Sequence, residues 1–319
     1  MKRVLITGGA GFIGSNLAHK LTEKGYDVVV LDNLSEQIHG KNPEIDSPLY
    51  ISLQSNNKVK FIKGCVTSSL DWQIALEDVD AVIHLAAFKA AGESMIDPGK
   101  YSQNNISGTI SLLNAMITHG VDKFIFSSTA AVYGYPKYLP LDENHPLEPI
   151  NYYGFTKLEI ERILKWYGEL KGLKFAALRY FNAAGYDPEG RIRFLENNPA
   201  NLIPIVMEVA SGRREKMEVF GNDYDTSDGT GVRDYIHVTD LASAHVKAIE
   251  YLKTNDSITV NLATGESHSV LDIIQETKEV SGKDIPFNIV DRRPGDPAEL
   301  YAGTTLAFDQ LNWRVKHSD

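Results

Sequence analysis

The segment from Thr7 to Gly14 constrains the fold of this chain more than any other segment. It reads Thr-Gly-Gly-Ala-Gly-Phe-Ile-Gly, follows an apolar run that is predicted to be a strand, and opens a stretch with apolar side chains at helical spacing. Gly8 permits a tight turn, Gly11 lets backbone N–H groups approach a phosphate, and Gly14 lets the helix pack close to the sheet. A glycine loop in this position is typical of folds that bind a dinucleotide through its pyrophosphate.

Short apolar runs alternate with helical stretches through the first half of the chain. Strands are predicted at residues 4–7, 27–32, 59–63, 81–84, 123–127 and 174–179. Helices are predicted at residues 12–24, 106–116 and 153–170. This alternation predicts an α/β protein with a Rossmann-type, doubly wound parallel sheet.

After residue 180 the pattern loosens into segments rich in Gly, Pro, Asn and Asp between short elements. Helices are predicted there at residues 202–210, 238–251 and 269–281, and strands near residues 217–220, 258–261 and 287–290. We therefore predict a dinucleotide-binding Rossmann domain at 1–180. A smaller α/β C-terminal substrate domain is predicted at 181–319, partly interleaved with the first, because loops are where specificity is usually built.

Composition and charge narrow the class of protein. The chain has 319 residues and a net charge of −10, and its Lys and Arg residues are scattered, so no nucleic-acid partner is predicted. It contains no apolar run of about 18 residues, so no membrane partner or span is predicted. Cys65 is the only cysteine, which excludes an internal disulfide and favours the cytoplasm. His84, His237 and His245 lack metal-ligand spacing, so we predict no metal site and a core position for His84.

Asp32 ends the second predicted strand, where an acidic side chain can accept hydrogen bonds from the ribose hydroxyls of an adenosine. A 2′-phosphate there would meet a like charge. The sequence therefore predicts NAD rather than NADP as the cofactor, the alternative for Asp32 being a turn-forming residue at a strand end.

Tyr153 and Lys157 are four residues apart, so a helix places both on one face. The pairs Tyr133/Lys137 and Tyr167/Lys171 have the same spacing, but only Tyr153 is expected near a nicotinamide. Removing a hydroxyl proton during hydride transfer requires a base, and a tyrosine with its usual pKa of about 10 needs nearby cations to act as one. We expect Lys157 and the oxidised nicotinamide to supply them. The alternative is a solvated helix stripe of Tyr153, Lys157 and Glu161.

A hydroxyl-rich segment, Ser127-Ser128-Thr129, ends the fifth predicted strand. The carboxyl ends of parallel strands open into the ligand crevice of such sheets. Thr129 is our candidate for the hydroxyl that binds the reacting oxygen and relays its proton to Tyr153. Ser127 and Ser128 are rival candidates, and each of the three also suits a structural turn.

The chain resembles the extended short-chain dehydrogenase/reductase family from end to end. The resemblance rests on the glycine loop, Leu31-Asp-Asn-Leu34, Leu85-Ala-Ala-Phe-Lys89, Tyr153–Lys157, Leu178-Arg-Tyr-Phe-Asn182 and above all Gly229-Thr-Gly-Val-Arg-Asp-Tyr-Ile-His-Val238. It implies a 4-epimerase of UDP-glucose and UDP-galactose. In such enzymes a tightly bound NAD takes hydride from sugar C4, the 4-keto sugar turns over, and the hydride returns to its other face. It also implies a homodimer, with residues 106–116 and 153–170 forming a four-helix bundle.

The resemblance assigns a role to individual residues. The catalytic residues are Tyr153, Lys157 and Thr129. Those around NAD are Gly8, Gly11, Phe12, Ile13, Gly14, Asp32, Asn33, Cys65, Val66, Leu85, Ala86, Ala87, Lys89, Asn104, Tyr153, Lys157 and Phe181. Those around the UDP-sugar are Lys89, Thr129, Tyr153, Asn182, Asn201, Leu202, Val219, Phe220, Arg233, Arg293, Asp296 and Leu300.

Three features bear on the activity within the family. Ala130-Ala131 follows Thr129 where dehydratases have Asp-Glu, which favours epimerisation without loss of water. Cys65 replaces a carboxylate expected at the adenine amino group. Leu300 is smaller than the tyrosine of strict hexose enzymes, so C4 epimerisation of a UDP-N-acetylhexosamine or a UDP-uronic acid is an alternative. A non-catalytic NAD-binding sensor or scaffold is the alternative outside enzymes.

Overall fold

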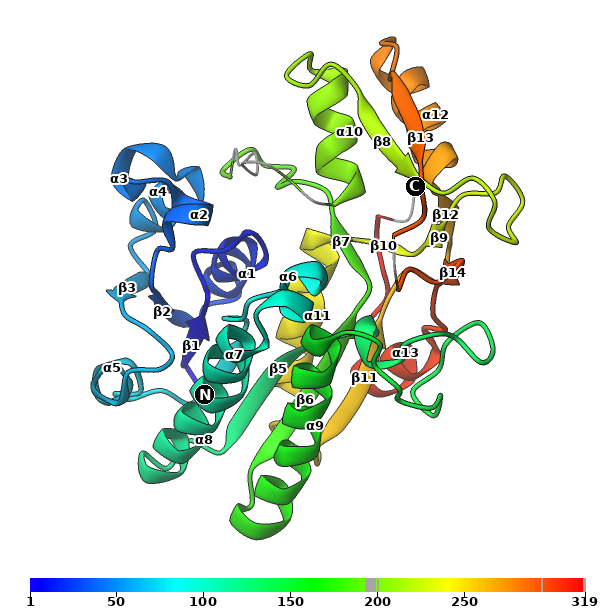
Figure 1. Ribbon diagram of the computed structural model, residues 1–319. Coiled ribbons are helices and arrows are strands. Elements are labelled where there is room, and N and C mark those ends of the chain that lie inside the picture. The colour runs from blue at the N-terminus through cyan, green and yellow to red at the C-terminus, as the bar shows by residue number, and fades with distance from the viewer. Residues whose placement is uncertain (193–198, 200, 294, 318–319) are drawn as a thin grey trace.

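The computed structural model describes residues 1–192, 199, 201–293 and 295–317 (Figure 1). Its centre is a parallel sheet of seven strands in the order β11-β6-β5-β4-β1-β2-β3. The strands are β1 (Arg3–Thr7), β2 (Asp27–Asp32), β3 (Val59–Lys63), β4 (Ala81–His84), β5 (Lys123–Thr129), β6 (Lys174–Tyr180) and β11 (Ile258–Leu262). The strand order reverses between β1 and β4, as in doubly wound Rossmann folds. The predicted fold class is thereby confirmed.

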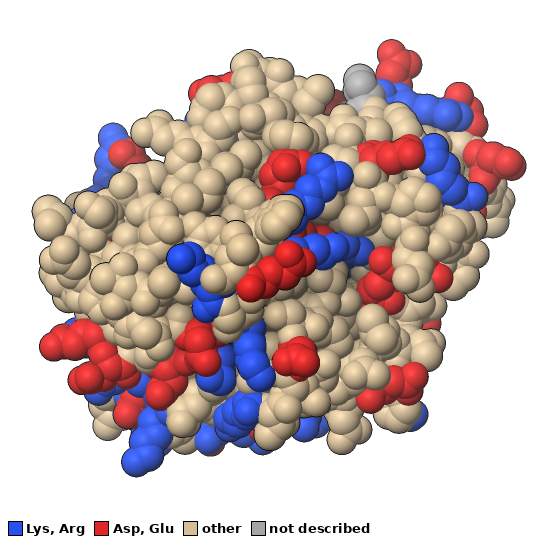
Figure 2. Space-filling model, turned by 90° about the horizontal axis from the view of Figure 1, so that it is seen from below, with Lys and Arg blue, Asp and Glu red and all other residues tan. Residues whose placement is uncertain are grey.

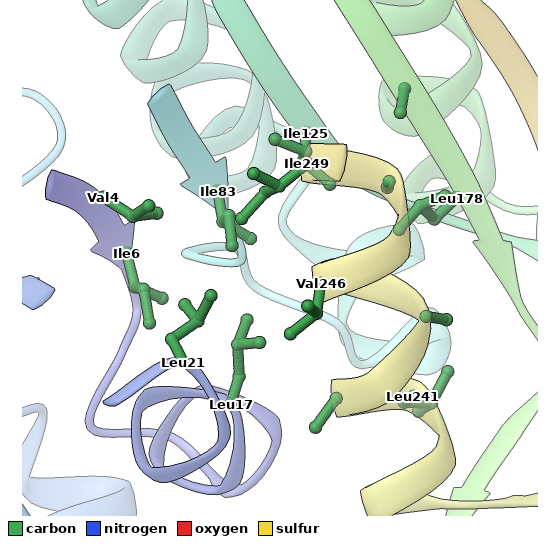
Figure 3. Close-up of a cluster of buried hydrophobic side chains, with 14 of the residues drawn as sticks. Val4, Ile6, Leu17, Leu21, Ile83, Ile125, Leu178, Leu241, Val246 and Ile249 are labelled. Carbon is green, nitrogen blue, oxygen red and sulfur yellow. The ribbon is translucent and has the colours of Figure 1, made fainter. Parts of the chain in front are cut away.

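The sheet strands are apolar on both faces because helices cover both. On one face Val4, Ile6, Ile83, Ile125 and Leu178 pack against α1 (Phe12–Glu23) and α11 (Val238–Tyr251), as Figure 3 shows. On the other face Leu5, Val82 and Phe124 pack with residues of α5 (Ser69–Ala75), α8 (Gly108–Thr118) and α9 (Tyr152–Lys171). Neighbouring residues of a strand point to opposite faces, so Val4 and Leu5 belong to different layers.

Residues 238–262 return to the central sheet although they lie in the second half of the chain. Strand β11 pairs with β6 in parallel register, Val260 opposite Leu178. Helix α11 supplies Leu241, Val246 and Ile249 to the same core cluster as Leu17 and Leu21 of α1 (Figure 3). The division at residue 180 remains a prediction, but the strand order places this segment with the N-terminal half.

The remaining C-terminal elements form three small sheets beside the carboxyl ends of the central strands (Figure 1). Strand β8 (Met217–Phe220) pairs with β13 (Phe287–Val290), and residues of α10 (Leu202–Ala210) and α12 (Val270–Ser281) share an apolar cluster with them. Strand β7 (Asn182–Ala184) pairs with β10 (Tyr235–His237). Strand β9 (Val232–Arg233) lies between β12 (His268–Ser269) and β14 (Glu299–Leu300). Helix α13 (Thr305–Leu311) packs through Ala307 and Leu311 on the central core.

Several short elements follow the carboxyl ends of the sheet strands. After β2 come α2 (Glu36–His39), α3 (Pro43–Asp46) and α4 (Pro48–Gln54); after β4 come α6 (Ala91–Ile96) and α7 (Pro98–Tyr101); after β5 comes the single turn η2 (Ala130–Val132). The helix predicted at 106–116 begins differently, because Ser102–Ser107 form a π-helical segment (η1) before α8 starts at Gly108. π-Helical segments are often found at functional sites.

Charged side chains of both signs are interspersed on the face that Figure 2 shows, without a broad area of one sign. None of the helices that the structure describes is both long and apolar enough to cross a membrane.

Candidate active site

The glycine loop lies where the strand order reverses, at the carboxyl end of β1 and beside the end of β4. Gly8 has a φ of +68°, and a Cβ on it would stand 2.7 Å from the Ala86 nitrogen. A Cβ on Gly14 would stand 2.5 Å from the Gly8 carbonyl oxygen. Gly11 caps α1 without a side-chain hydrogen bond, which leaves the first N–H groups of α1 for an anionic ligand. The loop therefore fits the pyrophosphate of a dinucleotide.

Asp32 stands at the carboxyl end of β2 and is buried. Its carboxylate accepts hydrogen bonds from the backbone N–H of Ala10 (3.0 Å) and of Leu34 (2.9 Å), which ties it to the glycine loop. Burial raises its pKa, and these two donors and His39 oppose the rise. His39, 3.8 Å from Asp32, has no counterpart in the sequence prediction. Asn33 follows with an exposed side chain.

Two further strand ends border the same crevice. After β3, the Cys65 N–H donates to the Asp71 carboxylate at 2.8 Å, so a carboxylate does lie next to the position where Cys65 replaces one. Val66 is buried against the position of Gly108. After β4 come the half-buried Leu85, Ala86 and Ala87.

The side chain of Asn105, in η1, fixes the loop after β4. It is buried, accepts from the Phe88 N–H (3.0 Å) and donates to the Phe88 carbonyl (3.0 Å). The neighbouring Asn104, a predicted NAD residue, donates to Asn105 at 3.0 Å. Lys89 lies in the same loop after β4, and its side chain is exposed. Asn105 was not predicted, because no spacing rule connects it to a strand end.

Tyr153, Lys157 and Thr129 come together at the carboxyl end of β5. The Thr129 side chain lies near enough to the Tyr153 hydroxyl to act on its pKa. The Lys157 ammonium donates to the Ser127 carbonyl at 2.7 Å and lies 5.9 Å from the centre of the Tyr153 ring. The Asn151 side chain caps α9 by accepting from Gly154, which sets where the helix begins. Phe181, at the end of β6, is buried in the cluster that also holds Ala130.

Burial acts on the ionisation of both Tyr153 and Lys157. Burial raises the pKa of Tyr153 to about 12, and the hydrogen bond with Thr129 opposes that rise. Burial also lowers the pKa of Lys157 to about 7. The same burial therefore favours the neutral form of both side chains.

The rival tyrosines are engaged elsewhere. The Tyr133 hydroxyl donates to Asn261 at 2.6 Å inside the protein, and the Tyr167 hydroxyl donates to Asn114 at 2.7 Å on the surface. The alternative of a solvated stripe is wrong, because Lys157 and Glu161 are buried.

His84 is buried, as predicted, but it lies in a polar chain that links two strand ends. Thr109 donates its hydroxyl to the Asn105 carbonyl (2.5 Å), so it accepts from His84 Nε2 (2.8 Å). His84 Nδ1 then accepts from the Thr7 hydroxyl at 2.6 Å, which requires a neutral imidazole. Burial lowers the pKa of His84 to about 3.

We expect this histidine to make the protein sensitive to acid. Between pH 3 and 6.5 the unfolded chain binds a proton at residue 84 that the folded chain does not. The free energy of unfolding therefore falls as the pH drops below 6.5, by up to about 1.4 kcal/mol per pH unit for this group. Urea titrations at several pH values in that range give the free energy of unfolding as a function of pH. This free energy should change less steeply with pH in His84→Gln than in the wild type. His119→Gln, at an exposed histidine, is the control, and equal slopes in all three proteins would refute the expectation.

The predicted UDP-sugar residues lie on the small sheets next to this crevice. Leu300 pairs with Arg233 between β14 and β9 and packs on the cluster that holds Phe181. Arg233 lies 3.8 Å from the Asp296 carboxylate. The Asn182 side chain donates to the Asp234 carbonyl at 3.0 Å.

The other predicted substrate residues lie on α10, β8 and the loop after β13. The Arg293 guanidinium stacks 3.8 Å from the Phe220 ring centre. Asn201 precedes α10 with an exposed side chain, Leu202 begins it, and the Val219 side chain is buried in the apolar cluster below. Asp234 connects Asn182 to Leu300, because its carbonyl accepts from Asn182 and its N–H donates to the Leu300 carbonyl at 3.3 Å. The contact of Arg293 with Phe220 belongs to a separate group of residues.

Comparison with known proteins places this site in a family. The profile of the NAD dependent epimerase/dehydratase family matches residues 4–263. The chain belongs to this family. It is therefore an NAD-dependent enzyme of the epimerase type, which confirms the predicted cofactor and decides against a non-catalytic sensor.

Members of the family are similar to the chain over nearly its whole length. The UDP-glucose 4-epimerase of Halalkalibacterium halodurans is 44% identical over 317 residues, which are 98% of this chain and 91% of that protein. The enzyme of the same name from Bacillus subtilis is 44% identical over 326 residues, with 98% and 92% covered. The crystal structure of UDP-glucose 4-epimerase from Brucella ovis in complex with NAD superposes with a TM-score of 0.91 at 42% identity, covering 100% of this chain and 95% of that one.

Proposed function

We propose that this member of the family interconverts UDP-glucose and UDP-galactose by inverting the sugar at C4. The observation that carries the proposal is the grouping of three side chains: Thr129 lies near enough to Tyr153 to lower its pKa, and Lys157 is held beside the Tyr153 ring on the Ser127 carbonyl. The residues after Thr129 are Ala130 and Ala131, which cannot protonate a leaving hydroxyl. This chemistry leads to epimerisation rather than to loss of water.

The residues of the chain divide the work of the reaction. Tyr153 removes the proton of the C4 hydroxyl, directly or through Thr129, and returns it when the sugar is reduced again. The glycine loop, Asp32 and the loop after β4 would hold NAD, which would supply the acceptor and donor of the C4 hydride and, when oxidised, a positive charge near Tyr153. Lys157 in its protonated form favours the phenolate by Coulomb attraction within the buried site.

Binding through the UDP part leaves the hexose free to turn. Arg233, Arg293 and Asn182 are candidates for contacts with the nucleotide, and they lie on elements other than those that carry Tyr153 and Thr129. Binding energy spent on this remote part holds the 4-keto sugar without fixing its orientation.

The range of sugars depends on Leu300. Its half-buried side chain packs on the cluster that holds Phe181. Because leucine is smaller than tyrosine, we propose that the pocket also admits UDP-N-acetylglucosamine. Competing this sugar against UDP-glucose measures the ratio of the two kcat/KM values, and a ratio near zero would restrict the enzyme to hexoses.

Two properties of the whole protein are further proposals. A homodimer through α8 and α9 is supported by apolar side chains that α9 exposes, Phe155, Trp166 and Leu170. Sedimentation as a monomer at micromolar concentration would argue against it. A cytoplasmic location rests on the single cysteine, and cell fractionation tests it.

The proposed activity predicts turnover without added cofactor. Purified protein given UDP-galactose, and no external NAD, should form UDP-glucose until both sugars reach equilibrium. Acid extraction of the same sample should release NAD. A preparation that releases NAD but forms no UDP-glucose would reject the proposed substrate pair.

A further inference from the structure

A buried ion pair lies one helical turn beyond Lys157. Glu161 of α9 and Arg179 of β6 are 2% and 4% exposed. Arg179 Nε donates to one carboxylate oxygen of Glu161 at 3.0 Å, and Nη2 donates to the other at 2.7 Å. Moving two charges out of water costs free energy, so a buried ion pair with two hydrogen bonds suggests a role beyond stability.

Neighbouring groups complete the hydrogen bonding of this pair. The Ser128 hydroxyl donates to Glu161 at 2.5 Å, and Arg179 Nη1 donates to the Tyr133 hydroxyl at 2.9 Å. The pair thus joins α9, β6, the end of β5 and the turn after it. Ser128 stands between Ser127, whose carbonyl accepts from Lys157, and Thr129, which lies near enough to Tyr153 to lower its pKa.

Lys157 and Glu161 are four residues apart on α9, a spacing at which opposite charges attract each other. Their side chains do not form an ion pair here, because Lys157 donates to the Ser127 carbonyl and both oxygens of Glu161 face Arg179. Without Arg179, the Glu161 carboxylate would be short of two donors, and the Lys157 ammonium is the cation that the helix spacing offers in exchange.

We propose that Arg179 is a positioning residue for proton transfer: by occupying both oxygens of Glu161, it keeps the Lys157 ammonium on the Ser127 carbonyl and beside Tyr153. The proposal rests on the epimerase activity proposed above and adds to it a residue that touches neither sugar nor cofactor. Arg179 restrains the Glu161 carboxylate, and the hydrogen bond from Ser128 to Glu161 connects the pair to the end of β5.

The pH dependence follows from the groups that face Lys157. These are Tyr153 on α9, the neutral His84 on β4, and the Phe126 ring on β5, 4.8 Å from the Lys157 nitrogen. Glu161 lies one helical turn further along α9, with its carboxylate on Arg179. Arg179 on β6 balances the charge of Glu161. Burial lowers the pKa of Lys157 to about 7, and an unbalanced carboxylate at Glu161 would raise it.

The test compares three proteins in the conversion of UDP-galactose to UDP-glucose across pH: wild type, Arg179→Met, and Arg179→Met combined with Glu161→Gln. We expect Arg179→Met to lower kcat at least about tenfold, because misplaced reacting groups cost rate steeply. KM should stay within about threefold. The apparent pKa that Lys157 gives to the pH profile of kcat, called the limb below, should rise by about one pH unit or more. The double variant should recover kcat to within about threefold of wild type and return the limb to its place, because glutamine cannot form an ion pair with Lys157.

A double variant no faster than Arg179→Met, with an unshifted limb in both, would overturn the proposal and leave the pair a purely structural one. If Arg179→Met does not fold, Arg179→Lys carries the same test, because its single ammonium leaves one oxygen of Glu161 to Lys157. It should show the lower kcat and the raised limb, and an unshifted limb would overturn the proposal. A wild-type protein without turnover rejects the proposed function and this inference with it. An active wild type with unshifted limbs rejects this inference alone.

Discussion

Tyr153→Phe is expected to lower kcat for UDP-galactose by about 10²–10⁴-fold, the usual contribution of a general base. The phenylalanine ring fills the same half-buried space beside Thr129 and Lys157 but has no hydroxyl to take the sugar proton. KM should change little, because the candidate UDP contacts lie on other elements. Steady-state rates and the NAD content of the acid extract measure both effects.

The same substitution at a second tyrosine of α9 serves as the control. Tyr167 has the same Tyr-x-x-x-Lys spacing and donates to Asn114 on the surface. Tyr167→Phe should therefore retain wild-type kcat within about twofold, since surface substitutions rarely matter. If Tyr153→Phe turned over as fast as Tyr167→Phe, Tyr153 would not be the base.

Gly14→Ala should weaken the binding of NAD. The added methyl would stand 2.5 Å from the Gly8 carbonyl oxygen and 2.6 Å from the Gly9 Cα, which are backbone atoms that cannot swing away. Overpacking of this kind costs about 1–3 kcal/mol, and relieving it by moving the loop misdirects the N–H groups that face the pyrophosphate. We expect NAD bound per protein to fall by about tenfold or more, since about 1.4 kcal/mol already corresponds to tenfold.

The control adds a methyl to a glycine with free space around it. Gly92 lies in α6, and a Cβ there meets nothing within 4 Å. Gly92→Ala should keep its full NAD content and Gly14→Ala should not. Equal NAD content in the two variants would show that the glycine loop is not what holds the cofactor.

Local patterns predicted the central sheet well because most of its strands are buried on both faces and read as apolar runs, and the edge strand β3 still carries Val59, Phe61 and Ile62. Strands β2, β3 and β4 begin and end where predicted, and α10 and α11 do as well. The placement of β11 beside β6 was not predicted, because nothing within residues 258–262 says which strand they will pair with. The short helices α2 to α4 escaped prediction for a related reason, since four to seven residues do not define a helical period.

Among the site residues, those with a chemical signature at a strand end were predictable. Asp32, Thr129 and the glycines are of this kind, and the structure gathers them along one edge of the sheet. The Glu161–Arg179 pair and Asn105 were missed because their partners are distant in the sequence, 18 residues away for Arg179 and 17 for Phe88. The protonation of Tyr153 was missed for a different reason, since its burial cannot be judged from the spacing of Tyr153 and Lys157 alone.

In the proposed epimerisation, the hydride that leaves C4 returns to the same carbon within one turnover. The most direct measurement uses UDP-galactose carrying deuterium at C4, incubated with the protein in ordinary water until equilibrium. We predict that the UDP-glucose formed keeps its deuterium at C4. When a second UDP-sugar with hydrogen at C4 and a distinct label elsewhere is added, no deuterium should appear in it. Loss of the deuterium to water, or its transfer between sugar molecules, would contradict the account.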